Sequence, residues 1–257
     1  MRIAMGIEYD GGGYSGWQRQ SHILAVQEVV ERAIGRVAAH PVEVTCGGRT
    51  DAGVHAVGQV IHFDTPAERN DRSWTLGCNA HLPDDVSIHW ARHVSDDFHA
   101  RFSALSRTYR YVILNRATRS ALWHGRAWWV HRPLTVERMQ EGARCLVGEH
   151  DFSSYRAVAC QAHSPVRIVR RLDVWRTHDL IFIEIQANGF LHHMVRNIAG
   201  VLAAIGRGDR SPDWAGEVLN WRDRTLGGVT APAAGLYFRE VEYPPAFGIP
   251  EGTRLPF

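Results

Sequence analysis

The chain has 257 residues, of which 45% are hydrophobic and 22% charged, a composition typical of a folded protein of one large or two modest domains. No apolar run reaches the ~20 residues of a membrane span, and the first residues lack the apolar core of a signal peptide. All 29 basic residues are arginine, which excludes mechanisms that need a lysine, such as a Schiff base or a Walker A loop. The 4 cysteines lack C-x-x-C spacing, so we expect a reduced, cytoplasmic protein without a zinc knuckle.

Hydrophobic periodicity predicts alternating strands and helices in the first hundred residues. A strand from Arg2 to Glu8 precedes a glycine-rich segment, and a helix begins near Ile23 and ends at His40. The elements expected next are strands at 42–45, 57–64 and 86–94 and a helix at 73–81.

A second series of elements begins near Ser106. It comprises strands at 107–114, 126–131 and 235–243, a helix at 136–146, a hairpin of 167–177 with 180–187, a helix at 191–205 and another from 211. Because the order of strands and helices recurs, we expect two α+β subdomains that share one sheet. We place them at residues 1–105 and 106–246, followed by a tail at 247–257.

The segment Gly11–Gly16 matches the G-x-G-x-x-G pattern of dinucleotide-binding proteins. That motif needs its glycines to open a helix, whereas here the helical pattern begins only near Ile23, and no acidic residue follows at the required strand end. We therefore interpret the segment as a flexible loop that displays Trp17, Gln18 and Arg19.

The histidines offer no recognisable metal site. His192 and His193 are adjacent on a predicted helix and so point about 100° apart, which is poor geometry for shared ligation. The zinc-hydrolase, zinc-deaminase and G-x-S-x-G nucleophile patterns are all missing from the sequence. We therefore expect no metal and no serine nucleophile, and we interpret the histidines as scattered surface and sheet residues.

The segment Gly47–Ala56 reads GGRTDAGVHA and places small residues around one carboxylate, Asp51, with Arg49 two positions before it. Glycines in such a segment allow tight turns and close approach of a ligand. The spacing is compatible with two interpretations, because an aspartate can cap a turn with its own side chain or act as a catalytic carboxylate.

Further blocks stand in order along the chain: Gly6–Gly11 with Gly16–Gln20, Asp97–Ser103 with Arg107–Tyr111, Phe190–Asn197, and Gly235–Phe238. Together with Gly47–Ala56 they resemble the A-type (TruA) family of tRNA pseudouridine synthases along nearly the whole chain. In that family the aspartate of the G-R-T-D-A-G-V-H stretch is catalytic. Gly47, where the family commonly has alanine, is a small departure that touches no assigned role.

The resemblance implies that Asp51 is the catalytic residue and that Tyr109 lies at the uracil pocket. It implies that Arg49 occupies the space of an extruded base and that Arg196 is the basic partner of the carboxylate. It further implies a pseudouridine-synthase fold, with two ferredoxin-like (RRM-like) subdomains sharing a mainly antiparallel sheet flanked by helices. The expected protein is a cytoplasmic, cofactor-free homodimer, an isomerase that acts on uridines 38, 39 and 40 of the tRNA anticodon stem-loop.

A net charge of only +2 means that any grip on tRNA phosphates must come from local groups of arginines. The candidates are Arg19, Arg101, Arg107 and Arg110, with further arginines at 116, 119, 167, 170, 171 and 176. Some of these belong to solvated strand faces. Tyr109 likewise has a structural interpretation, as a sheet-core aromatic on one face with Tyr111 and Ile113.

Two alternative functions follow from the same residues. A non-catalytic RNA-binding protein with paired RRM-like folds would leave Asp51 without a role, and pseudouridine formation in unmodified tRNA would distinguish it. A nucleotide-dependent oxidoreductase would show thermal stabilisation by NAD or NADP.

Overall fold

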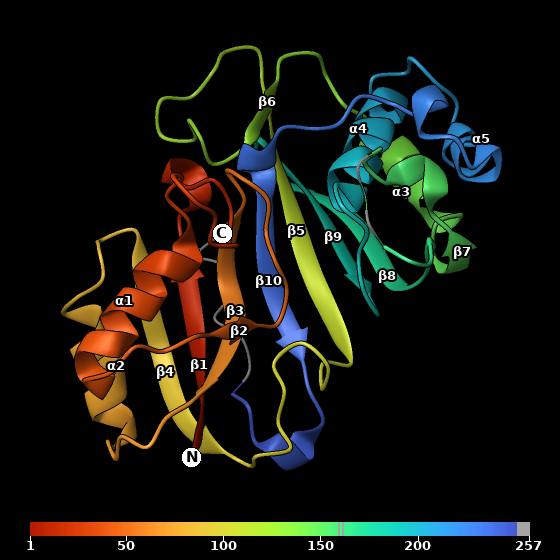
Figure 1. Ribbon diagram of the computed structural model, residues 1–257. Coiled ribbons are helices and arrows are strands. Elements are labelled where there is room, and N and C mark those ends of the chain that lie inside the picture. The colour runs from red at the N-terminus through yellow and green to blue at the C-terminus, as the bar shows by residue number, and fades with distance from the viewer. Residues whose placement is uncertain (159, 161, 251–257) are drawn as a thin grey trace. The chain divides into compact units, whose positions relative to one another are not determined.

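The computed structural model describes residues 1–158, 160 and 162–250 of the chain (Figure 1). Within these residues, ten strands belong to one large sheet. Its pairs are mostly antiparallel, with a parallel pair between β5 (Ser106–Asn115) and β6 (Trp128–Val130). The expected α+β class with a central, mainly antiparallel sheet is confirmed. The chain divides into two compact units, Met1–Arg107 with the segment from Phe238 onward, and Thr108–Tyr237.

The first unit contains the strand order β4-β1-β3-β10, with β2 paired to β3. Its strands are β1 (Arg2–Tyr9), β2 (Thr45–Cys46), β3 (His55–Asp64), β4 (Val86–Val94) and β10 (Leu236–Glu242). Two helices, α1 (Val26–Ala38) and α2 (Asp71–Asn79), cover one face of these strands (Figure 1). Trp74 of α2 meets Phe63 of β3 edge-on, with ring centroids 5.4 Å apart, and both side chains are buried. The core therefore lies between this helix layer and the sheet.

The second unit contains the strand order β5-β9-β8-β7, with β6 paired to β5. Its further elements are α3 (Val136–Arg144), β7 (Gly148–Asp151), β8 (Val166–Thr177), β9 (Leu180–Ala187), α4 (Met194–Gly206) and α5 (Trp214–Trp221). The expected β8–β9 hairpin is confirmed, with Thr177 paired to Leu180. Most residues of α4 are buried, and its polar Asn197 is accommodated because Nδ2 donates to Tyr155 O at 2.7 Å.

Two of the predicted elements in the first unit differ from the structure. The first helix begins at Val26, whereas Ile23 forms an isolated antiparallel bridge with Gln20 and is 46% exposed. The strand expected at 42–45 is reduced to β2, Thr45–Cys46. Val44 N–H donates instead to the buried carboxylate of Glu31 at 3.1 Å, so a side chain of α1 takes the place of a neighbouring strand.

The expected display of Trp17 on a flexible loop is wrong. Trp17 is 1% exposed and packs near Tyr9, with ring centroids 5.9 Å apart. Residues Gly11–Gly13 form a 3-10 turn rather than an open loop, and Asp10 Oδ1 caps it by accepting from Gly12 N–H at 2.9 Å. The indole removes enough apolar surface from water to draw the segment into the core.

His192 and His193 also differ from prediction, because they precede α4 instead of lying on it. His193 is the residue before the helix and has a left-handed backbone, with φ of 62°. The two rings lie against each other with centroids 4.0 Å apart. The short strand β7 was not predicted, since Gly148–Asp151 carries no alternating apolar pattern.

All four cysteines, at positions 46, 78, 145 and 160, are free thiols. In the part of the chain that the structure describes, no helix is both long and apolar enough to cross a membrane. The domain limits at 105 and 246 stay a prediction, and residues 251–257 of the expected tail lie outside the described residues.

Candidate functional site

The loop Gly47–Gly53 connects β2 to β3 and presents Asp51, whose side chain is half-buried. Its backbone is joined to the segment at residues 14–17, which lies more than thirty positions earlier. The hydrogen bonds run from Trp17 N–H to Thr50 O at 3.0 Å and from Gly53 N–H to Tyr14 O at 3.3 Å. The carboxylate is therefore carried on a loop that is held at both ends.

Gly16 of the opening segment packs against this loop at a position that requires glycine. Its φ is +94°, a conformation that side chains disfavour. A Cβ there would lie 2.8 Å from Thr50 O and 3.1 Å from the carbonyl carbon of Asp51. Gly16 has no side chain, and only for this reason can the backbone of Thr50 and Asp51 pack this closely against the opening segment.

Side chains from the sheet hold the residues on either side of Arg49. Gln59 of β3 accepts from Gly48 N–H at 3.3 Å and donates to Gly48 O at 2.6 Å. Tyr9 of β1 shares a 2.7 Å hydrogen bond with Thr50 Oγ1, and burial raises the pKa of Tyr9, which keeps the phenol neutral. Arg49 itself is exposed, so its guanidinium projects from a stretch of backbone that is held on both sides.

Two arginine charges act on Cys46, the residue that precedes the loop. Burial raises the pKa of the Cys46 thiol to about 11, while the charges of Arg49 and Arg101 act in the opposite direction. The guanidinium of Arg107 donates to Gly47 O at 3.0 Å and to Arg101 O, and so links the two segments. Arg49 and Arg101 therefore both lie close enough to Cys46, the residue before the loop, for their charges to act on its thiol.

Two histidines support the turn at residues 99–102 beside this loop. His62 of β3 accepts from Ala100 N–H at 3.1 Å through Nδ1. Nδ1 of His99 accepts from the N–H groups of Arg101 and Phe102, at 3.2 and 3.1 Å. Burial, together with the charge of neighbouring His99, lowers the pKa of His62 to about 4, and burial also lowers the pKa of His99. Both rings are thus held neutral, as acceptors.

Acid is expected to destabilise the protein through His62. An unfolded histidine titrates near 6.5 and folded His62 near 4, so between these pH values the unfolded chain binds more protons. The free energy of unfolding should lose roughly 2 kcal/mol from this residue between pH 7 and pH 5. Urea unfolding at several pH values measures the loss.

The variant His62→Asn tests this assignment, because its amide oxygen can still accept from Ala100 but does not titrate. Its stability should depend less on pH by the stated amount. His178→Asn, on the exposed turn between β8 and β9, is the matched control and should behave as the unmodified protein. An unchanged pH dependence in His62→Asn would contradict the assignment.

The other expected site residues lie in the second unit. Tyr109 of β5 is 9% exposed, and its ring meets Phe190 edge-on with centroids 4.9 Å apart. Arg196 of α4 is half-buried, and its Nε donates to Ala231 O at 2.8 Å. Arg49 and Asp51 belong to the first unit, so the expected set is divided between the two.

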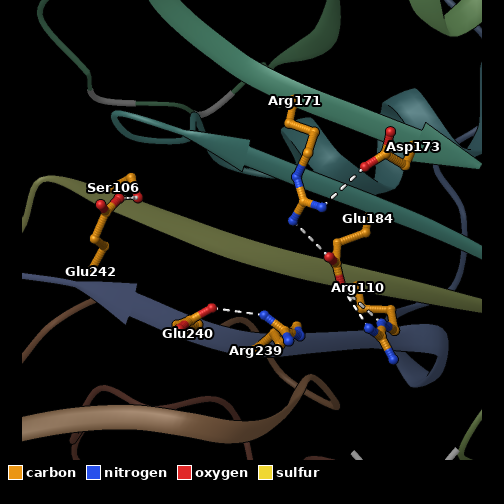
Figure 2. Close-up of polar contacts among 8 residues, drawn as sticks. All are labelled: Ser106, Arg110, Arg171, Asp173, Glu184, Arg239, Glu240 and Glu242. Atoms are coloured by element: carbon orange, nitrogen blue, oxygen red, sulfur yellow. Dashed lines mark hydrogen bonds and ion pairs between the residues drawn. The ribbon is translucent and has the colours of Figure 1, made fainter. Parts of the chain in front are cut away.

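Arg110, expected on the RNA-binding face, belongs to an ion-pair network of the second unit (Figure 2). Its Nε and Nη2 donate to Glu184 Oε2 at 2.9 and 2.7 Å, and its guanidinium lies 5.1 Å from the Trp175 ring. Glu184 also accepts from Arg171 at 2.8 Å, and Arg171 pairs with Asp173 at 3.2 Å (Figure 2). The two arginines and the two carboxylates carry equal and opposite charge. Much of the positive charge of Arg110 and Arg171 is therefore neutralised by ion pairs within the protein.

The remaining arginine candidates differ in how strongly they are engaged. Arg19 pairs with buried Glu31 at 2.8 Å but keeps 54% of its side chain exposed. Arg101 is exposed and lies over the Phe102 ring, 5.4 Å from its centroid. Arg107, by contrast, is half-buried and bridges two backbone carbonyls. Arg19 and Arg101 therefore have the most accessible guanidinium groups of the four.

A family model for tRNA pseudouridine synthase matches residues 5–103 and 143–244 of this chain. The chain belongs to this family. The tRNA pseudouridine synthase A of Methylococcus capsulatus is 59% identical over 249 residues, which cover 97% of this chain and 92% of the relative. That of Coxiella burnetii is 54% identical over 256 residues (100% and 98% covered), and that of Vibrio cholerae is 54% identical over 251 residues (98% and 95% covered).

Membership of the tRNA pseudouridine synthase family confirms the resemblance, and it makes this protein an isomerase. The non-catalytic RNA-binding alternative is not favoured. Several residues that hold the loop were not singled out from the sequence. Gly16 and Tyr9 fall within the opening family blocks, whereas Gln59 is polar at a strand position that periodicity cannot distinguish from an exposed one.

Proposed function

We propose that the protein converts uridine to pseudouridine at positions 38, 39 and 40 of the tRNA anticodon stem-loop, with Asp51 as the catalytic carboxylate. The observation that carries the proposal is the glycine-framed loop, which presents a half-buried carboxylate between the fixed backbones of Gly48–Thr50 and Gly53 in a chain of this family.

The chemistry fits a protein carboxylate acting without a cofactor. The N1–C1′ bond of uridine breaks, the uracil turns, a C5–C1′ bond forms, the C5 proton leaves, and N1 gains a proton. Atoms and electrons balance within the nucleotide, so neither oxidant nor reductant is needed. An ionised Asp51 can attack C1′, attack C6 of the uracil, or assist removal of a ribose proton.

Arg49, Tyr109 and Arg196 have separate roles in this proposal. A target in a stem must leave the stack at a cost of a few kcal/mol. Arg49, exposed on a fixed backbone, suits insertion into the vacated space, and Tyr109 packs against the extruded base. Arg196 is, in this proposal, the basic partner of the Asp51 carboxylate.

The proposal is tested with an anticodon stem-loop RNA that carries tritium at C5 of its uridines. Pseudouridine formation must release that tritium into water, and we expect release in EDTA without added nucleotide or flavin. Replacing the uridines at 38, 39 and 40 by cytidine should abolish it. A protein that binds the RNA without releasing tritium would instead be the non-catalytic RNA-binding protein.

Binding of tRNA should weaken steeply with salt despite the small net charge, because affinity follows the number of phosphates neutralised locally. We propose phosphate contacts from Arg19, Arg101, Arg107 and Arg110. Arg107 and Arg110 are the least exposed of the four, so the test replaces the two exposed residues, Arg19 and Arg101, together by glutamine. Because Arg19 also pairs with buried Glu31, urea unfolding of the variant must show that it is folded before its salt slope is compared.

The slope of log K against log salt should flatten by about one to two phosphate contacts, at roughly 0.7–0.9 per contact. The double variant Arg69→Gln with Arg144→Gln removes the same charge from exposed positions and should leave the slope unchanged. Equal slopes for both double variants would place the phosphate contacts elsewhere.

The homodimer and the cytoplasmic location that the family resemblance implies are part of the same proposal. A dimer would let one subunit hold the stem while the other holds the target uridine. Sedimentation equilibrium of the purified chain measures the subunit number directly.

A further inference from the structure

Phe102 is an exposed aromatic side chain that packs against a neighbouring imidazole. It is 75% exposed, and its ring stacks on His99 with centroids 4.4 Å apart and an interplanar angle of 29°. His99 in turn lies 4.7 Å from the ring of buried His62. A single exposed phenylalanine is ordinary, but this one stacks on the imidazole of His99, which itself packs against the tilted ring of His62.

Hydrogen bonds fix the backbone of the same turn from several directions. Besides the acceptor bonds of His62 and His99, Ala100 O accepts from Tyr243 OH at 2.6 Å. Burial raises the pKa of Tyr243, so this donor keeps its proton. The turn is therefore a rigid support, and the solvent exposure of Phe102 is not a consequence of a loose loop.

This support lies next to the loop that carries Asp51. A Cβ at Gly47, the first residue of that loop, would lie 3.4 Å from Ala100 O. Arg107 bridges Gly47 O and Arg101 O, and the charges of Arg49 and Arg101 both act on the Cys46 thiol. An RNA strand held at the loop would therefore pass close to residues 99–102.

We propose that Phe102, supported by His99 and flanked by Arg101, is a stacking platform for an unpaired nucleobase of the RNA substrate close to the target uridine. The inference rests on the proposed function and adds a binding residue to it. The planar ring of Phe102 can stack on a nucleobase, and the guanidinium beside it can contact a phosphate of the same strand. An acidic peptide would supply negative charge for the guanidinium but no planar base to stack on the ring. One ring with a cation over it is also far smaller than the apolar patch of a stable subunit interface.

The test measures steady-state kinetics and base stacking on an anticodon stem-loop RNA. Phe102→Ala should raise KM about tenfold and leave kcat within a few fold, because stacking acts on binding. Phe102→Tyr, which keeps an aromatic face, should retain the original KM. Leu122→Ala, at a side chain 87% exposed in the second unit, is the matched control and should change neither constant.

A second readout separates stacking from activity. RNAs carrying 2-aminopurine at one unpaired position at a time should show one position whose fluorescence is quenched by the unmodified protein and Phe102→Tyr, but not by Phe102→Ala. Quenching is measured whether or not pseudouridine forms, so failure of the platform is distinguishable from failure of the proposed function. Equal KM and equal quenching in Phe102→Ala would overturn the inference. A kcat loss at constant KM, or a change from dimer to monomer on sedimentation, would also overturn it.

Discussion

Asp51→Asn is expected to abolish pseudouridine formation, with the single-turnover rate falling by a factor on the order of 10⁴ or more. The amide keeps the size and shape of the carboxylate but is neither a nucleophile nor a base, so every route open to Asp51 is closed. Affinity for tRNA should stay within a few fold, because one carboxylate contributes little to binding a polyanion. Tritium release and filter binding measure the two effects separately.

Asp84→Asn is the matched control, since Asp84 is an exposed aspartate in the turn before β4 of the same unit. It should leave both rate and affinity unchanged. Substantial turnover in Asp51→Asn would refute the assignment of the catalytic carboxylate. An equal loss in both variants would point to a general effect of charge.

Gly16→Ala is expected to lower the turnover rate about 100-fold, although Gly16 touches no substrate in the proposal. The new Cβ would lie 2.8 Å from Thr50 O, so the Thr50–Asp51 peptide or the opening segment must shift. Displacing a catalytic group by about 1 Å lowers the reaction rate by a factor of about 100. The left-handed backbone adds strain, and we expect stability to fall by about 1–3 kcal/mol.

Gly208→Ala separates the displacement from the strain. Gly208 also has a left-handed backbone, with φ of +80°, but an added Cβ there would meet no atom within 4 Å. It should lose stability by a similar strain cost and keep its turnover rate. If Gly16→Ala retained full activity but unfolded at a lower urea concentration, the opening segment would support the fold without positioning Asp51.

Local pattern predicted most of the elements in this protein. Strands β1, β4 and β9 and the hairpin turn at His178 follow directly from alternating or continuous apolar residues. Asp51 and Arg49 were recognisable because they stand in one short segment with its glycines, so their proximity is guaranteed by the chain itself.

Periodicity does not predict the environment of polar residues in the interior of the sheet. Gln59 and His62 are polar residues of β3 that a periodic pattern would assign to solvent, yet they are 0% and 6% exposed. Strand β3 is buried along nearly its whole length, so polar side chains there must find partners inside the protein. Those partners, Gly48 and Ala100, come from segments the pattern does not connect to the strand.

The family, the α+β class and the segment that carries the carboxylate can all be inferred from local sequence. The burial of Trp17, the ion pair of Arg110 with Glu184 and the exposure of Phe102 on a rigid turn follow only from the folded structure. Periodicity records which face of an element is apolar. Whether a given aromatic or arginine faces water or a partner depends on what a distant part of the chain places opposite it, and that is fixed only when the segments pack together.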